Sequence, residues 1–151
     1  MAELKERLRA DLNAAMRARD QVRMRTLRLA LTSITNEEVA GASARDLTDD
    51  EVVRVLTREA RKRREAAEAF SAAGRSDQAA AERAEGDVLA GYLPAQLSDD
   101  ELAALVDAAI AETGASSLSG LGQVMKTVTP RVAGRADGAR VAAEVRRRLS
   151  S

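Results

Sequence analysis

The chain contains no histidine, cysteine or tryptophan, and only one tyrosine and one phenylalanine among its 151 residues. Without cysteine it forms no disulfide and performs no thiol chemistry. Without histidine, acid–base catalysis near neutral pH would need a carboxylate, lysine or tyrosine whose pKa is strongly shifted. Zinc sites mostly use cysteine or histidine ligands, and the DxDxDG pattern of a calcium loop does not occur. We therefore predict no catalytic residue, no metal and no cofactor.

Long apolar segments are also missing from the sequence. There is no run of 18 apolar residues, and the opening MAELKERLRADL is charged from its third position. The sequence thus predicts neither a signal peptide nor a membrane span. We expect a cytoplasmic protein with no membrane partner.

Small aliphatic and charged residues make up most of the chain. Hydrophobic residues account for 45% of the sequence and aromatic residues for 1%, which predicts a thin-layered core like that of a helix bundle. The 24 basic and 24 acidic residues balance. Nonspecific nucleic-acid binders are usually strongly basic, so an anionic partner of this chain would have to bind a local patch.

Apolar residues recur at helical spacing along most of the chain. The first predicted helix, residues 3–19, carries on one face Leu4, Leu8, Leu12, Ala15 and Met16. We predict further helices over residues 21–39, from Thr48 to Gly74, over 76–92, from Ser98 to Gly114, around 121–128 with limits at Pro130 and Gly134, and from Asp137 to Leu149. No segment alternates like a strand. The expected fold is all-α, with a four-helix N-terminal domain (residues 1–93) and a small three-helix C-terminal domain (residues 94–151).

Two helix starts follow the pattern of a capping box, in which a Ser or Thr hydroxyl and a Glu three residues later each bind the other's backbone N–H. Thr48 pairs in this way with Glu51, and Ser98 with Glu101. The adjoining aspartates suit the positive end of the helix dipole. An acid–base site at residues 49–51 or 99–101 is the alternative, and we favour the helix start.

Several clusters of basic residues could bind an anion. Arg58, Arg61 and Lys62 share a helix face, although glutamates nearby favour an ordinary solvated surface. Five more arginines surround the junction of the first two predicted helices, at positions 17, 19, 23, 25 and 28.

The segment from Arg131 to Arg140 differs from these clusters. It contains Arg131, Arg135 and Arg140 with a single acid, Asp137, which we expect to cap the last helix. Glycines on either side of Asp137 expose backbone N–H groups near a helix start, and such groups together with arginine favour phosphate. A tight interhelical turn without a ligand is the simpler interpretation. On the preceding helix, Gln123 and Lys126 lie on the polar side, opposite Val124 and Val128.

Three short motifs in the C-terminal third resemble the GatB/YqeY family. They are YLP with QLS (residues 92–94 and 96–98), GQVMK (residues 122–126) and GRADG (residues 134–138). Their order and spacing together make the match strong, and the length and the four-plus-three helix order also fit a standalone YqeY-like member over essentially the whole chain. The family also includes the tail domain of the B subunit of the tRNA-dependent amidotransferase. In that enzyme the similar tail helps to hold tRNA, while other parts of the enzyme convert a misacylated glutamyl or aspartyl group to its amide.

The resemblance implies two helical domains and a role connected with tRNA. The family label is carbon–nitrogen ligase activity with glutamine as amido-N-donor, but the catalytic parts of the amidotransferase lie outside the shared module. We therefore expect a noncatalytic tRNA-binding or RNA-binding module, with an accessory role in glutamine-dependent amidotransfer at most. Its predicted RNA-binding residues are Gln123, Lys126, Arg131, Arg135 and Arg140. A helical adaptor whose partner is another protein is the alternative.

Overall fold

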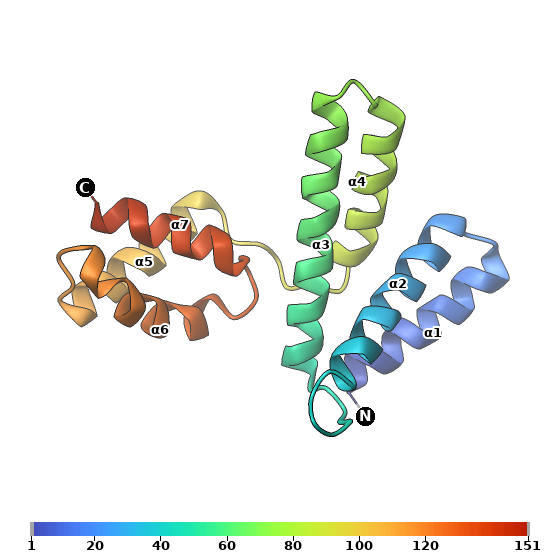
Figure 1. Cartoon of the computed structure of the whole chain (residues 1–151), viewed down its shortest axis with the longest axis horizontal. Helices are drawn as coiled ribbons and strands as arrows, with labels where there is room; N and C mark the ends of the chain where they lie inside the picture. The colour runs from blue at the N-terminus through green and yellow to red at the C-terminus, as the bar shows by residue number, and fades with distance from the viewer. Residues whose placement is uncertain (1, 151) are drawn as a thin grey trace. The chain divides into compact units, whose positions relative to one another are not determined.

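The computed structural model describes residues 2–150, and every secondary-structure element in that range is a helix, which confirms the predicted all-α class. Figure 1 shows the helices. Within residues 2–150 they are α1 (Glu3–Ala18), α2 (Gln21–Glu38), α3 (Asp49–Ala72), α4 (Ser76–Ala90), α5 (Asp99–Thr113), the short 3-10 helix η1 (Leu118–Gly120), α6 (Leu121–Val132) and α7 (Gly138–Leu149). None of the described helices combines the length and the apolar character needed to cross a membrane.

The chain divides into two compact units, Met1–Leu93 and Pro94–Ser151. We call them the N-terminal unit and the C-terminal unit. Each has a hydrophobic core of its own, built mainly from leucine, valine and alanine. Tyr92 is the only aromatic residue among the buried members of the two cores.

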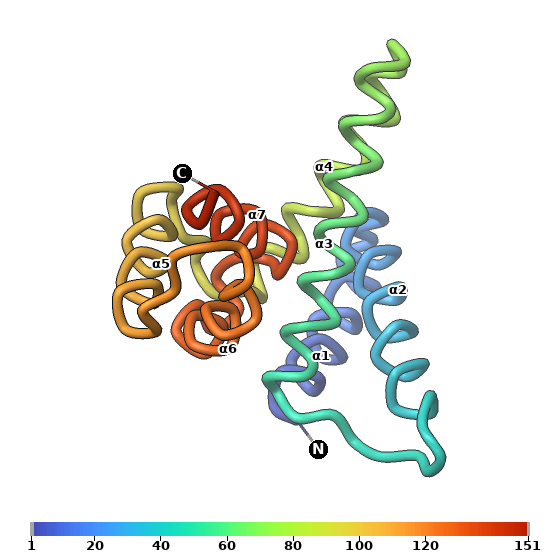
Figure 2. The backbone as a smooth tube through the Cα atoms, turned by 60° about the vertical axis from the view of Figure 1, so that its left-hand side comes forward, coloured from blue at the N-terminus to red at the C-terminus, as the bar shows by residue number. Residues whose placement is uncertain are grey.

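The N-terminal unit consists of two helix pairs, α1 with α2 and α3 with α4, as Figures 1 and 2 show. Leu8, Leu27, Ile34, Val52 and Leu56 are 0% exposed and form the centre of the core between these pairs. Helix α3 has 24 residues, which corresponds to about 36 Å at 1.5 Å per residue. It is therefore long enough to contact the first pair with one part of its length and α4 with the rest.

The C-terminal unit packs α5, α6 and α7 around a valine-rich centre. Val106, Val124, Val128 and Val145 are 0% exposed. The backbone N–H of Leu97 donates to the carbonyl oxygen of Arg135 at 2.8 Å. This hydrogen bond fixes the segment before α5 to the turn between α6 and α7.

Local sequence determines where several helices begin. Both predicted capping boxes are present: Thr48 with Glu51 at the start of α3, and Ser98 with Glu101 at the start of α5. Asp137 caps α7, where its Oδ1 accepts from the N–H of Arg140 at 2.9 Å. These three predictions are confirmed. Each cap is a hydrogen bond between residues three positions apart, so the local sequence is enough to predict it.

Other expectations were wrong in detail. Of the two expected limits of α6, Gly134 holds and Pro130 does not: the helix continues past Pro130 to Val132, which is only 3% exposed and packs in the C-terminal core. Met16 was predicted on the buried face of the first helix, yet it is 45% exposed. Part of the predicted loop before α6 forms η1. Helices α1 to α4 also end one or two residues earlier than predicted.

Candidate nucleic-acid interface

The five residues predicted to bind RNA lie on a continuous stretch of the C-terminal unit. Gln123, Lys126 and Arg131 are on α6, Arg135 is in the turn after it, and Arg140 is in the first turn of α7. All five are at least partly exposed. Their surroundings nevertheless differ, and they divide into three groups.

Gln123 and Lys126 are the freely accessible members. Both are exposed, on the side of α6 that faces away from the buried Val124 and Val128. Among residues 2–150, neither side chain has a hydrogen-bond or ion-pair partner. The ammonium group of Lys126 is therefore available to an anion without giving up an internal contact.

Arg131 and Arg140 form ion pairs with carboxylates of α5. Arg131 contacts Glu112, and Nη2 of Arg140 donates to Oδ1 of Asp99 at 2.9 Å. The Asp99 side chain is 100% exposed and that of Glu112 is 55% exposed. Exposed pairs of this kind typically contribute about 0–1 kcal/mol. A phosphate can therefore replace the carboxylate at small cost.

Arg135 has a structural role in the turn. Its guanidinium donates through Nη2 to the carbonyl oxygen of Arg131 at 2.9 Å and through Nε to that of Val132 at 3.2 Å. These carbonyls belong to the last turn of α6, where no further helical N–H is available to them. Arg135 thus closes the C-terminal end of α6, and its guanidinium is only partly available to a ligand.

The backbone just before Arg135 adopts the left-handed conformation that Gly134 favours. Ala133 and Gly134 both adopt the left-handed conformation, with φ of 49° and 79°. A Cβ added at Gly138 would meet no atom within 4 Å, so the backbone at the start of α7 is open to solvent. The Asp137 side chain already occupies the N–H of Arg140. A ligand at this end of α7 would have to share the remaining N–H groups with solvent.

Charge is segregated along the C-terminal unit. Its basic residues all lie at or after Lys126, in the α6–α7 region, whereas most of its carboxylates are on α5, at positions 99, 100, 101, 107 and 112. The basic residues were predicted from the sequence, but the contribution of α5 was not. The signal was present as a run of acids on one helix and a run of bases on the next two.

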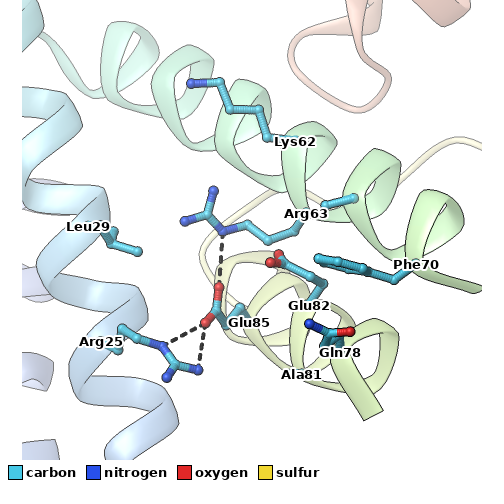
Figure 3. A pocket seen from close by; sticks show the side chains of 10 residues that line it. Arg25, Leu29, Lys62, Arg63, Phe70, Gln78, Ala81, Glu82 and Glu85 are labelled. Atoms are coloured by element: carbon cyan, nitrogen blue, oxygen red, sulfur yellow. Dashed lines mark hydrogen bonds and ion pairs between the residues drawn. The ribbon is translucent and has the colours of Figure 1, made fainter. Parts of the chain in front are cut away.

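The N-terminal unit contains a groove of about 550 Å³ between α2, α3 and α4. Figure 3 shows Glu85 at its base, contacted by Arg25 from one side and by Arg63 from the other. Nε of Arg25 donates to Oε1 of Glu85 at 2.8 Å, and Nε of Arg63 lies 3.4 Å from Oε2 without hydrogen-bond alignment. The apolar wall includes Leu29, which is 42% exposed, and Phe70.

The two capping-box glutamates, Glu51 and Glu101, are held in their ionised form. The hydrogen bond from Arg45, helped by the backbone of Thr48, lowers the pKa of Glu51 to about 2. The backbone and hydroxyl of Ser98 lower the pKa of Glu101. Both shifts move away from neutral pH, which supports a capping role for these residues over acid–base chemistry. Among residues 2–150, no three carboxylates are grouped so that they could hold a metal ion.

The family model described as Yqey-like protein matches residues 5–149. A comparison with curated proteins gives no match.

Proposed function

The chain belongs to the Yqey-like protein family, as its motifs predicted, and from this premise we propose that it is a noncatalytic RNA-binding module whose ligand is tRNA. The observation that carries the proposal is the segregation of charge in the C-terminal unit, where all basic residues lie in the α6–α7 region. A balanced chain can bind a polyanion only through such a local patch. Lys126 and Gln123 are its accessible centre.

The five residues contribute in different ways. Lys126 contacts a phosphate directly, and Gln123, one turn away on α6, hydrogen-bonds to phosphate or ribose. Arg131 and Arg140 exchange their α5 carboxylates for phosphate. Arg135 mainly holds the turn in shape. Binding through phosphate depends on salt, because each contact releases counterions from the nucleic acid.

A titration of labelled bulk tRNA at several salt concentrations tests this function. We expect the combined Lys126→Gln, Arg131→Gln and Arg140→Gln variant to reduce the slope of log K against log salt by about 0.9 for each duplex phosphate that it no longer neutralises. The matched control changes three arginines of the N-terminal unit that pair with carboxylates, Arg45→Gln, Arg58→Gln and Arg61→Gln. Absence of salt-dependent binding by the wild type, or an unchanged slope in the first variant, would contradict the proposal.

Any part in glutamine-dependent tRNA amidotransfer is accessory in this proposal. The chain would hold tRNA, while the carbon–nitrogen ligase chemistry of the family label takes place on another protein. The absence of cysteine and histidine supports this division, since glutamine hydrolysis commonly uses an activated nucleophile. Glutaminase activity of the highly purified chain that disappears on one point mutation would overturn it.

The groove between α2, α3 and α4 favours a second function, that of a protein-interaction adaptor. Its exposed Leu29 offers an apolar contact, and the cations at its rim, Arg25 and Lys62, have side chains that are 58% and 66% exposed. The carboxylates that pair with them, Glu85 and Glu59, are only 9% and 11% exposed. The accessible charge of this rim is therefore positive, which suits an acidic amphipathic helix as the partner.

A pull-down from nuclease-treated native lysate distinguishes the adaptor function from RNA binding. We expect a stoichiometric protein partner that is lost with Leu29→Asp and retained with Val39→Asp, because Val39 is an exposed apolar residue outside the groove. Recovery of RNA without a stoichiometric protein counts against the adaptor, as does recovery of the same protein with both variants.

A further inference from the structure

The junction of α1 and α2 carries a concentration of positive charge that the proposed RNA site does not use. Residues 17–28 include five arginines and one acid, Asp20. Figure 1 shows this junction at the end of the α1–α2 pair. The Asp20 side chain is engaged as the N-cap of α2, where its Oδ1 accepts from the N–H of Arg23 at 3.1 Å.

The structure separates the cations of the N-terminal unit into those with carboxylate partners and those without. On α3 and the loop before it, ion pairs with glutamates involve Arg45, Arg58, Arg61, Lys62 and Arg63. At the junction, Arg25 pairs with Glu85 and Arg23 donates to the Tyr92 hydroxyl. Arg17, Arg19 and Arg28 are exposed and have no hydrogen-bond or ion-pair partner for their side chains among residues 2–150.

Requirements of folding do not explain all three arginines. Arg17 lies in the last turn of α1, where the helix dipole favours a cation, but the dipole offers nothing to Arg28 within α2. Arg19 ends α1 with φ of 57°, a left-handed conformation that glycine adopts with least strain. A strained position that keeps a side chain without internal contacts points to a role outside the fold.

We propose that Arg17, Arg19 and Arg28 form a second phosphate-binding surface, through which the N-terminal unit contacts the RNA backbone. This inference rests on the proposed RNA-binding function. Guanidinium groups bind phosphate through two parallel hydrogen bonds. Contacts to phosphate fix the position of a nucleic acid and do not read its sequence. The junction therefore adds affinity that depends on salt and is the same for different RNA sequences.

The full-length Arg17→Gln, Arg19→Gln, Arg28→Gln variant tests this surface with bulk tRNA as the probe. We expect the slope of log K against log salt to fall by about two to three units if each arginine contacts one duplex phosphate. The control is again Arg45→Gln, Arg58→Gln, Arg61→Gln, which removes the same charge from the same unit. Circular dichroism melts of both variants check that the helices remain folded.

The outcomes separate this inference from the proposed function. A reduced slope in the junction variant with a smaller change in the control supports the second surface. Equal reductions in both variants indicate a net-charge effect and overturn the inference. An unchanged slope in the junction variant also overturns it.

If the junction variant instead loses binding to phosphatidylglycerol vesicles while tRNA binding is intact, the surface contacts lipid and the inference fails. An effect of the C-terminal variant alone retains the proposed function and rejects the second surface, whereas an effect of the junction variant alone supports the second surface and rejects the C-terminal site. A wild type that does not bind tRNA overturns both.

Discussion

At the scale of single residues, Tyr92 combines burial with polar and cationic contacts. It is 7% exposed, and its hydroxyl donates to Oδ2 of Asp11 at 2.5 Å. The guanidinium of Arg7 lies 4.7 Å from the ring centroid, within the range of a cation–π interaction. Burial, together with the hydrogen bond and negative charge of Asp11, raises the pKa of Tyr92 to about 12.

Replacement of Asp11 should lower this pKa. In Asp11→Asn, the carboxylate that disfavours tyrosinate is gone, so we expect the pKa of Tyr92 to move from about 12 toward the ordinary value of 10.0. Ultraviolet absorbance of tyrosinate measures it directly, because Tyr92 is the only tyrosine and the chain has no tryptophan. The exposed Asp46→Asn serves as the control. An unchanged pKa in Asp11→Asn would assign the shift to burial alone.

The buried pair of Lys5 and Glu38 should be far more sensitive to mutation than an exposed pair. Nζ of Lys5 lies 2.7 Å from Oε1 of Glu38, and their side chains are 6% and 11% exposed. In Lys5→Ala the Glu38 carboxylate stays buried without its partner, so we expect the free energy of unfolding to fall by about 3 kcal/mol. Arg58→Ala, which breaks the exposed pair with Glu37, should cost less than about 1 kcal/mol.

Urea unfolding of the two variants gives this comparison. The double variant Lys5→Met, Glu38→Leu should recover most of the loss, because no unpaired charge remains in the interior. Equal destabilisation by Lys5→Ala and Arg58→Ala would show that burial of the Lys5 pair is unimportant.

At the scale of the helices, the sequence predicted well wherever a feature depends on neighbours along the chain. The capping boxes at Thr48 and Ser98 and the cap at Asp137 are local hydrogen bonds, and all three are present. The predictions at Pro130 and Met16 were wrong because tertiary packing decided them: Val132 packs in the core, whereas Met16 stays 45% exposed.

Removal of one cap should weaken its helix measurably. In Ser98→Ala, the N–H of Glu101 loses its acceptor at 3.1 Å, and we expect a loss of about 1 kcal/mol in the free energy of unfolding. Thermal melts followed by circular dichroism measure the change. Ser116→Ala, at an exposed serine between α5 and η1, is the matched control and should melt like the wild type. A melt of Ser98→Ala identical to that of the control would contradict the importance of the cap.

In the candidate RNA site, too, the sequence predicted local features but not those that depend on tertiary packing. The sequence identified the basic residues of α6 and α7, and the exposure of Lys126 follows from its helical position opposite Val124. It did not reveal that Arg131 pairs with Glu112, 19 positions earlier, or Arg140 with Asp99, 41 positions earlier. Such partners depend on how α5 packs against the other two helices, which local patterns do not contain.

At the scale of the whole molecule, the absence of histidine should give a stability that is nearly independent of pH around neutrality. Hydrogen bonds from Lys5, Arg45 and Arg147 lower the pKa of Glu38, Glu51 and Glu144 below the ordinary 4.5. A lowered folded-state pKa contributes stability above pH 4.5 that is lost as the pH falls through the folded-state value. The raised pKa of Tyr92 contributes stability below pH 10 that is lost as the pH rises toward 12.

Urea midpoints across the pH range test this expectation. We expect a plateau between the acid and alkaline limbs, with a decline below about pH 4.5 and another above about pH 10. The Asp11→Asn variant should show a weaker alkaline decline. A midpoint that changes steeply near neutral pH would mean that a group titrates there and would contradict the predicted absence of an acid–base residue.

The burial of Lys5 has a practical consequence for chemical modification. The chain has three lysines, at positions 5, 62 and 126, and only the last two are exposed. An amine-reactive reagent applied to the folded chain should therefore acylate Lys62 and Lys126 and spare Lys5. Each unit thus presents a single reactive lysine side chain, and protection of Lys126 from acylation would report a bound partner on α6 without any substitution in the protein.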